Sequence, residues 1–474
     1  MASICTSNVT SGFIDLATFD ELEKYMYGGP DATAYFVRET RKSTWFTQVP
    51  VVLSRASGNA NFDTEWSVSI SRAGDYLLST WLRVTIPEVV PNPATFGDVG
   101  SSNTLRLRWT RNFMHNLVAE CCITFNDLVA ARFDNYHLDF WAAFTVPAGK
   151  RTGYNNMIGN ITQLTDPHGN GIPNAGNNIP SMTLNLPLPF WYSRDSGVAL
   201  PTAALPYNDM RLNFSFRNWD QLLIKDDISL ANNVRSVCAT TGDLETPSNM
   251  VLSNVQVWAN YAIVSNDERK RMACAPRDIL IEQVQTAPRQ TFAPNTVLTP
   301  RYDIRFSHAI KVFFFGVRNK TLACAWSNYT AGSPIVSGAT VSYSINPAMR
   351  DPILATSLIY ENTQRLSNMG SDYFSLVNPW YCAPVIPVET GYHMYSYSLD
   401  FICLDPMGST NYGKLTNVSI APTGSQAAVD GAAGTGQDPN DSQATWVQHY
   451  EFIVTCINNN IIRISGGALG FPVL

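Results

Sequence analysis

The chain has 474 residues with a formal net charge of −6, and 15% of its residues are charged while 45% are hydrophobic. The nearest approach to a basic patch is Arg269-Lys270-Arg271, so direct binding of nucleic acid is not expected. No apolar run approaches the roughly 18 residues of a membrane-spanning helix, and the N-terminus lacks the basic start and apolar run of a secretory signal. So few charges indicate a surface that is largely buried in contacts.

An N-terminal arm, residues 1–34, is expected to carry one short helix. Thr18 and Glu21 have the spacing of a capping box, in which a hydroxyl and a carboxylate satisfy free amides at a helix start. Gly28-Gly29-Pro30 should end this helix after barely two turns. Because so short a helix is marginal alone, the arm should dock on the rest of the chain or on a neighbouring subunit.

From about residue 35 the hydrophobic period is two, which predicts β-strands. Trp66, Val68 and Ile70, for example, alternate with serines. A helix is predicted from an N-cap at Asn126 to Phe144, because large apolar residues follow one another at spacings of three and four. The strands predicted in this half are residues 66–70, 76–86, 105–109, 117–125, 184–193 and 210–216.

A weakly patterned stretch at 221–254, rich in small polar residues, predicts the connection between two domains. The Ala/Gly/Ser/Asp tract at 421–443 predicts an exposed loop, and so does the Gly/Asn/Pro-rich segment at 165–180. The strands predicted after the connection are residues 255–264, 304–317, 357–360, 392–404, 450–457 and 461–465.

The two halves repeat a pattern. ITFND at 123–127 leads to DNY at 134–136, and LIYEN at 358–362 leads to SDY at 371–373. Each follows a long apolar strand by a similar distance, 44 residues from Trp81 to Phe125 and 46 from Phe314 to Tyr360. The agreement indicates a duplicated β-rich unit of about 200 residues, too long for a solenoid repeat. With 28 prolines and 29 glycines for turns, an all-β chain is expected.

Two glycine-rich segments are candidates for phosphate-binding loops. Residues 408–414 nearly match one, but Leu415 follows where Ser or Thr is needed, and the next residues read as a strand. The segment 465–471 leaves no room for a helix and is expected to form a close-packed terminal turn. Nucleotide binding is therefore not expected.

No metal or catalytic constellation is found among the histidines and cysteines. His308 lies inside an apolar predicted strand and should be a core imidazole; no HExxH or G-x-S-x-G occurs. The odd count of cysteines without C-x-x-C predicts reduced, packed thiols, with links between subunits as the alternative. The sequence neither identifies nor excludes a pair of carboxylates of the glycosidase type. The residues concerned are His115, His137, His168, His308, His393 and His449, and Cys5, Cys121, Cys122, Cys238, Cys274, Cys324, Cys382, Cys403 and Cys456.

Segments spread along the whole chain resemble the major capsid protein family of iridoviruses, most nearly that of invertebrate iridoviruses. They are SGFIDLATFDELEKYMYGG (11–29), SRAGDYLLSTWLRV (71–84), RTGYNNMIGN (151–160), FWYSRDSGVALPTAALPYNDMRLNF (190–214), RFSHAIKVFFFGVRN (305–319), GSTNYGKLTN (408–417) and NNNIIRISGGALGFPVL (458–474).

The resemblance implies a tandem double jelly roll, two eight-stranded antiparallel sandwiches at 35–220 and 255–474 joined by the segment 221–254. It implies a homotrimer whose six barrels form a near-hexagonal block of an icosahedral shell, enclosing a membrane-bound DNA core. Assembly in the host cytoplasm, minor capsid proteins and an inner viral membrane as partners are implied too. The family has no catalytic, metal-binding or cofactor-binding residues to carry over.

Two other classes of function are the alternatives. A secreted β-sandwich lectin or adhesin would be supported by a signal peptide and paired cysteines, neither of which the sequence predicts. A β-rich glycoside hydrolase would be revealed by turnover of a polysaccharide panel, and none is expected. A structural subunit is therefore the expected function.

Overall fold

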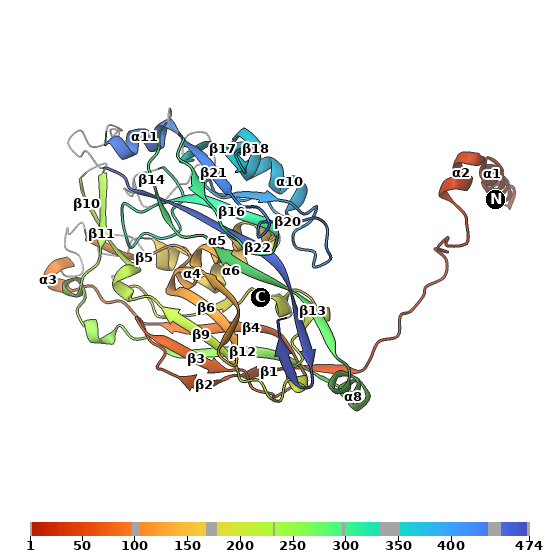
Figure 1. The fold of residues 1–474 in the computed structure, drawn as a ribbon, viewed down its shortest axis with the longest axis horizontal. Coiled ribbons are helices and arrows are strands. Elements are labelled where there is room, and N and C mark those ends of the chain that lie inside the picture. Colours follow the sequence, from red (N-terminus) through yellow and green to blue (C-terminus); the bar gives the residue numbers. More distant parts are fainter. Residues whose placement is uncertain are drawn as a thin grey trace. The chain divides into compact units, whose positions relative to one another are not determined.

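Two pairs of antiparallel sheets, one pair after the other along the chain, form the core of this computed structural model (Figure 1). The structure describes residues 2–96, 105–166, 178–230, 233–295, 299–331, 351–434 and 447–471. By its internal contacts the chain divides into two units, Met1–Trp45 and Phe46–Leu474. In the described residues, no helix is long and apolar enough to cross a membrane.

The first barrel pairs two sheets whose strands come from residues 46–264. Its strands are β1 (Phe46–Val52), β2 (Ser54–Ser57), β3 (Glu65–Ser69), β4 (Tyr76–Ile86), β6 (Val118–Phe125), β7 (Leu128–Asp134), β8 (Met182–Pro187), β9 (Met210–Phe216) and β12 (Ser253–Val264). One sheet has the order β1-β12-β4-β8, and the other β2-β3-β9-β6-β7.

The second barrel repeats this arrangement. Its strands are β13 (Arg277–Thr286), β14 (Gln290–Phe292), β15 (Tyr302–Asp303), β16 (Ala309–Asn319), β17 (Ile353–Tyr360), β18 (Thr363–Gly370), β19 (His393–Ser396), β20 (Thr410–Asn411), β21 (Val418–Gly424), β22 (Tyr450–Ser465) and β23 (Ala468–Gly470). The sheet orders are β13-β22-β16-β19 and β15-β21-β17-β18. Apart from β2, β14, β20 and β23, the described strands of either barrel follow one order: first, eighth, third and sixth, then second, seventh, fourth and fifth. The predicted double jelly roll is confirmed.

The repeated sequence segments lie at equivalent places in the two barrels. The turn between β6 and β7 is Asn126-Asp127, and the turn between β17 and β18 is Glu361-Asn362. All four residues have positive φ, between 46° and 67°, as two-residue hairpin turns require. The predicted duplication therefore corresponds to a hairpin that occurs once in each barrel.

The helix predicted from Asn126 to Phe144 is wrong in its first half. Residues 128–134 form strand β7, and helix α5 (Asn135–Thr145) begins only after Asp134. Val129, which the helical spacing had counted, is 46% exposed on that strand. The apolar residues after Asn126 are compatible with either period, and the hairpin turn at Asn126-Asp127 places them in a strand.

The segment 221–254, predicted as a connection, contains strands. β10 (Leu223–Leu230) and β11 (Asn233–Cys238) extend a small sheet with β5 (Leu105–Trp109). Polar residues obscured the pattern because this sheet contains an internal ion pair, Arg108 Nε to Asp226 Oδ2 at 2.6 Å. Strand β12 pairs with β1 and β4, so we propose that the boundary between the barrels follows Val264 instead of preceding Val255.

Other predicted elements are shifted or shortened. β8 stops at Pro187, β19 covers only His393–Ser396 of the predicted 392–404, and β22 is one strand where two were predicted. The predicted loop at 421–443 instead begins with the end of β21 and helix α11 (Gln426–Ala433). Its residues 435–443 lie outside the described residues, and so do 167–177 of the loop predicted at 165–180. The further helices are α3 (Pro93–Phe96), α4 (Phe113–Leu117), α6 (Ala148–Ile158), α7 (Thr162–Thr165), α8 (Asn266–Cys274), α10 (Asn378–Cys382), α11 (Gln426–Ala433), the π-helix η7 (Tyr373–Val377) and the 3-10 turns η1 (Trp191–Ser193), η2 (Ser196–Val198), η3 (Thr202–Ala204), η4 (Trp219–Gln221), η5 (Thr241–Asp243) and η6 (Pro247–Asn249).

The N-terminal unit has two helices, α1 (Ala2–Ala17), which was not predicted, and α2 (Glu21–Met26). The capping box belongs to Asp20 and Glu23 and not to Thr18 and Glu21. Thr18 is used differently, because its hydroxyl donates to the carbonyl of Asp15 at 2.6 Å, at the end of α1. The arm therefore contains two helices where one was predicted.

Candidate functional site: the contact between the two barrels

Helix α5 of the first barrel lies against strand β16 of the second. The helix begins where it does because the carboxylate of Asp134 accepts a hydrogen bond from the amide of His137 at 3.0 Å. From α5, the rings of Phe140 and Phe144 stack on Phe314, with centroids 6.0 and 5.4 Å away. All three rings are fully buried, so the core of the first barrel continues onto the outer face of the second.

The helix approaches β16 closely because the strand has a glycine there. A Cβ atom on Gly316 would lie 3.0 Å from Cζ of Phe140. Tyr329 and Tyr392 complete the aromatic cluster, with ring centroids 5.4 and 5.6 Å from that of Phe140. Such aromatic contacts stabilise an interface by more than their buried area alone.

Asp139, also on α5, gathers polar groups from both barrels. The groups at its carboxylate are Asn112 Nδ2 at 3.2 Å, His115 Nδ1 at 2.8 Å, Ser327 Oγ at 2.8 Å and Tyr329 Oη at 2.9 Å. His115 Nε2 in turn lies 2.6 Å from the hydroxyl of Tyr154 on α6. Burial raises the pKa of Tyr154, and the charge of Asp139 adds to the effect. A buried carboxylate with this many partners fixes how the barrels sit together.

Glu282 on β13 is a second buried carboxylate at the same contact. It binds Lys311 of its own barrel at 2.6 Å and Arg194 of the first barrel at 3.1 Å. Lys311 also donates to the carbonyl of Cys403 at 2.6 Å. The Arg194 guanidinium lies over the ring of Trp141, 3.8 Å from its centroid. Removing one partner of such a set would leave a charge buried without compensation.

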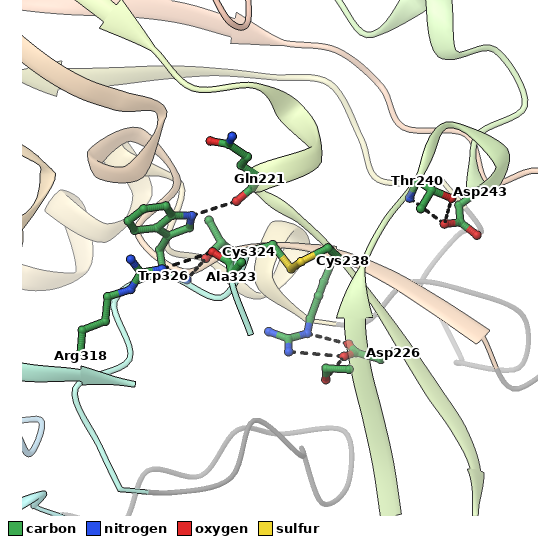
Figure 2. Close-up of a disulfide and its surroundings, with 12 residues drawn as sticks. Gln221, Asp226, Cys238, Thr240, Asp243, Arg318, Ala323, Cys324 and Trp326 are labelled. Atoms are coloured by element: carbon green, nitrogen blue, oxygen red, sulfur yellow. Dashed lines mark hydrogen bonds and ion pairs between the residues drawn. A yellow bond between two sulfur atoms is a disulfide. The ribbon is translucent and has the colours of Figure 1, made fainter. Parts of the chain in front are cut away.

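A segment of the second barrel after β16 reaches into the first (Figure 2). A disulfide joins Cys324 to Cys238 at the end of β11. Two residues further on, the ring of Trp326 lies between the guanidinium groups of Arg217 and Arg318, 4.0 and 3.6 Å from its centroid. The expectation of reduced thiols is wrong for this pair, because folding brings together residues 86 apart in sequence.

A buried serine, histidine and aspartate meet in the second barrel. His393 Nε2 lies 2.7 Å from Asp351 Oδ2 and 3.3 Å from the Ser371 hydroxyl. That hydroxyl donates to the same carboxylate of Asp351, so the histidine is not placed to take its proton. All three residues are buried, and they tie together the ends of β17, β18 and β19.

The glycine-rich segments and His308 lie outside these clusters. Residues 408–414 contain the short strand β20 and a turn, and the next element is β21. His308 is not a core imidazole: it is half-buried, precedes β16 and has a φ of 62°. In 465–471, Gly466 and Gly467 form the turn to β23 with positive φ, as expected of a terminal turn. Among the described residues, no group of three metal-ligating side chains is close enough to hold an ion.

Comparison with known proteins agrees with the topology. Residues 34–264 match the family described as major capsid protein N-terminus, and residues 268–470 match large eukaryotic DNA virus major capsid protein. The chain is 64% identical over 472 residues to the major capsid protein of Costelytra zealandica iridescent virus, covering 100% of both chains. It is equally similar, 64% over 475 residues and 100% of both chains, to that of Invertebrate iridescent virus 6.

The chain belongs to the major capsid protein family of large eukaryotic DNA viruses. The resemblance to invertebrate iridovirus capsid proteins is thus confirmed. As a major capsid protein the chain is a structural component of the virion shell and not an enzyme, as predicted.

Solved capsid proteins share the fold. PBCV-1 VP54 superposes with a TM-score of 0.71 at 19% identity, covering 93% of this chain and 100% of that one. The Faustovirus major capsid protein superposes with a TM-score of 0.62 at 13% identity, covering 94% and 95%. Both are double jelly rolls, so the fold of the capsid protein is retained where little sequence identity remains.

Proposed function

We propose that this capsid protein assembles as a homotrimer, and that its trimers tile an icosahedral shell around a membrane-bound DNA core. The observation that carries the proposal is the identical strand order of the two barrels. Three such chains supply six similar barrels, so a three-fold particle can offer nearly equivalent edges to six neighbours. Trimers of neighbouring capsomers, minor capsid proteins and an inner membrane are the proposed partners; direct contact with nucleic acid is not proposed.

Electron microscopy of the purified chain in negative stain tests this proposal. Uniform triangular or hexagonal particles of three chains are expected. A population of single chains across the accessible concentration range would contradict it.

The N-terminal unit is proposed to bind beneath the trimer, on the side that faces the membrane. Its described side chains are nearly all exposed, among them Phe13, Ile14, Leu16 and Phe19 at 50–73%. Apolar helices of this kind gain stability only when a partner covers them. Minor capsid proteins or the membrane side of the capsomer are the partners we propose.

Deletion of residues 1–30 is expected to leave the trimer intact and to abolish shell formation, because the two barrels do not include this segment. The measurement is particle yield by microscopy when the truncated chain replaces the full chain during infection. Shells of normal size and number from the truncated chain would count against this role.

A further inference from the structure

The two barrels differ in how the segment after their fifth strand is covered. In the first barrel, β7 leads into α5, which is buried against the second barrel. In the second, β18 leads into η7 and α10, which expose Leu376, Val377, Trp380 and Tyr381 at 38, 42, 70 and 78%. The topology thus gives each barrel one docking segment, and only one of the two is covered within the chain.

The exposed segment has apolar residues at the positions that α5 uses for docking. Each segment follows its strand with a tyrosine, Tyr136 in the first barrel and Tyr373 in the second. Counted from these tyrosines, Phe140 and Phe144 correspond to Val377 and Tyr381. The residues that cover Phe314 within one chain thus have exposed apolar counterparts.

The face that would receive this segment also has a counterpart. Strands β4 and β16 each have a bulge in their pairing with the eighth strand, which skips Leu78 in one and Lys311 in the other. Trp81 and Phe314 are each the third residue after the skipped one. Phe314 is fully buried by α5, whereas Trp81 is half-buried and stacks on the half-buried Trp258 of β12, with centroids 6.2 Å apart.

The strand edges show the same difference. Within the chain, β7 of the first barrel lies beside β13 of the second, and Gln283 Nε2 donates to the carbonyl of Ala130 at 2.7 Å. The equivalent strands of the opposite pair are β18 and β1. Every residue of β1 except Val51 is exposed, and β18 is mostly exposed. An exposed edge strand with apolar side chains such as Phe46, Val49 and Val52 is a surface on which another chain can pack.

We propose that η7, α10 and β18 of one copy pack against β4, β12 and β1 of a second copy. This contact would repeat between chains the one that α5 and β7 make with β16 and β13 within a chain. It rests on the proposed trimer, and it names the surfaces through which the trimer closes. Because the contact joins two different faces, it is head-to-tail; three internal and three external contacts of the same kind close a ring of six barrels.

Matched substitutions of the exposed Tyr381 and Val49 and of the half-buried Trp81 test the assignment. Tyr381→Asp changes the proposed docking segment, and Trp81→Asp and Val49→Asp change the receiving face. Tyr207→Asp is the control, because Tyr207 is as exposed as Tyr381, 76% against 78%, and belongs to none of the six elements of the proposed contact. The mass of each purified full chain is measured by light scattering across concentration, and circular dichroism and thermal melting check the fold.

The wild type and Tyr207→Asp are expected to be trimers. Tyr381→Asp and the receiving-face variants are expected to need at least tenfold higher concentration to associate, with unchanged spectra. Trimers of Tyr381→Asp that are as tight as the wild type would overturn the assignment and leave the trimer standing. A wild type that stays monomeric would instead remove the proposed function.

Mixing provides a second measurement that does not depend on loss of association. Tyr381→Asp keeps an intact receiving face, and Trp81→Asp keeps an intact docking segment. A head-to-tail contact therefore predicts that the two variants form 1:1 dimers when mixed at a concentration at which neither associates alone. Absence of mixed dimers in native mass spectrometry at concentrations where the wild type is trimeric would overturn the assignment.

Discussion

At the scale of single residues, the contact between the barrels depends on groups whose sequence surroundings give no sign of their role. Asp139 lies among other polar residues in the first turns of an apolar helix, and its partner Ser327 lies 188 residues away. In the sequence, Glu282 cannot be told from an ordinary strand residue, because its partners Arg194 and Lys311 are not near it along the chain. Such partners come together only through the fold, so no spacing rule could find them.

The disulfide between Cys238 and Cys324 is expected to stabilise the folded chain. It closes a separation of 86 residues, for which loop entropy gives an upper value of about 4–5 kcal/mol. Reducing agent should therefore lower the melting temperature of the wild type, but not that of a Cys238→Ser, Cys324→Ser double variant. Cys274→Ser, at an exposed free cysteine, should respond like the wild type. An unchanged melting temperature on reduction of the wild type would contradict this expectation.

His137 is expected to make stability depend on pH. Burial, with a further contribution from the charge of Arg194, lowers its pKa from 6.5 to about 3. Between these values the unfolded chain binds a proton that the folded chain does not, so stability falls as pH falls from 6.5 towards 3. The loss is on the order of a few kcal/mol.

The measurement is denaturant unfolding at a series of pH values, with His137→Leu compared with His449→Leu, a change at an exposed histidine. The first variant should have a flatter profile between pH 6.5 and 4, and the second should follow the wild type. Identical slopes in all three proteins would rule out this role of His137.

At the scale of elements, several strands were predicted well from the local sequence, and alternation is clearest in β9, where one face is buried. Residues 76–86, 105–109 and 210–216 were predicted with the bounds they have. The errors have physical causes: Asn126-Asp127 is a left-handed turn whose flanking residues also fit a helical period, and β10 carries polar residues that pair inside the sheet. Local patterns cannot decide between two periods when tertiary contacts determine which structure forms.

Removal of the Phe140 ring tests whether α5 docking stabilises the chain. Phe140→Ala is expected to cost about 3–5 kcal/mol in the free energy of unfolding, because a fully buried ring between the barrels leaves a cavity. Val377→Ala, at the exposed counterpart, should change the stability of the single chain by less than about 0.5 kcal/mol. Equal effects of the two substitutions would contradict the docking described for α5. Both are measured by urea unfolding of dilute protein.

At the scale of the whole molecule, the duplication was visible in sequence, but its geometry was not. Order and spacing of two short segments indicated a repeated unit, and the family resemblance supplied the jelly roll. The structure adds the register, in which Trp81 and Phe314 occupy the same place relative to a bulge. Phe314 is covered within the chain, whereas Trp81 is half-buried. A single chain therefore covers only one of its two equivalent faces.

A reconstruction of the purified capsid protein by single-particle cryo-electron microscopy tests this account most directly. It should show six barrels around a three-fold axis, with α10 of each chain over β4 and β12 of the next. A map of a single chain, or a ring in which Tyr381 and Trp81 both face solvent, would contradict it.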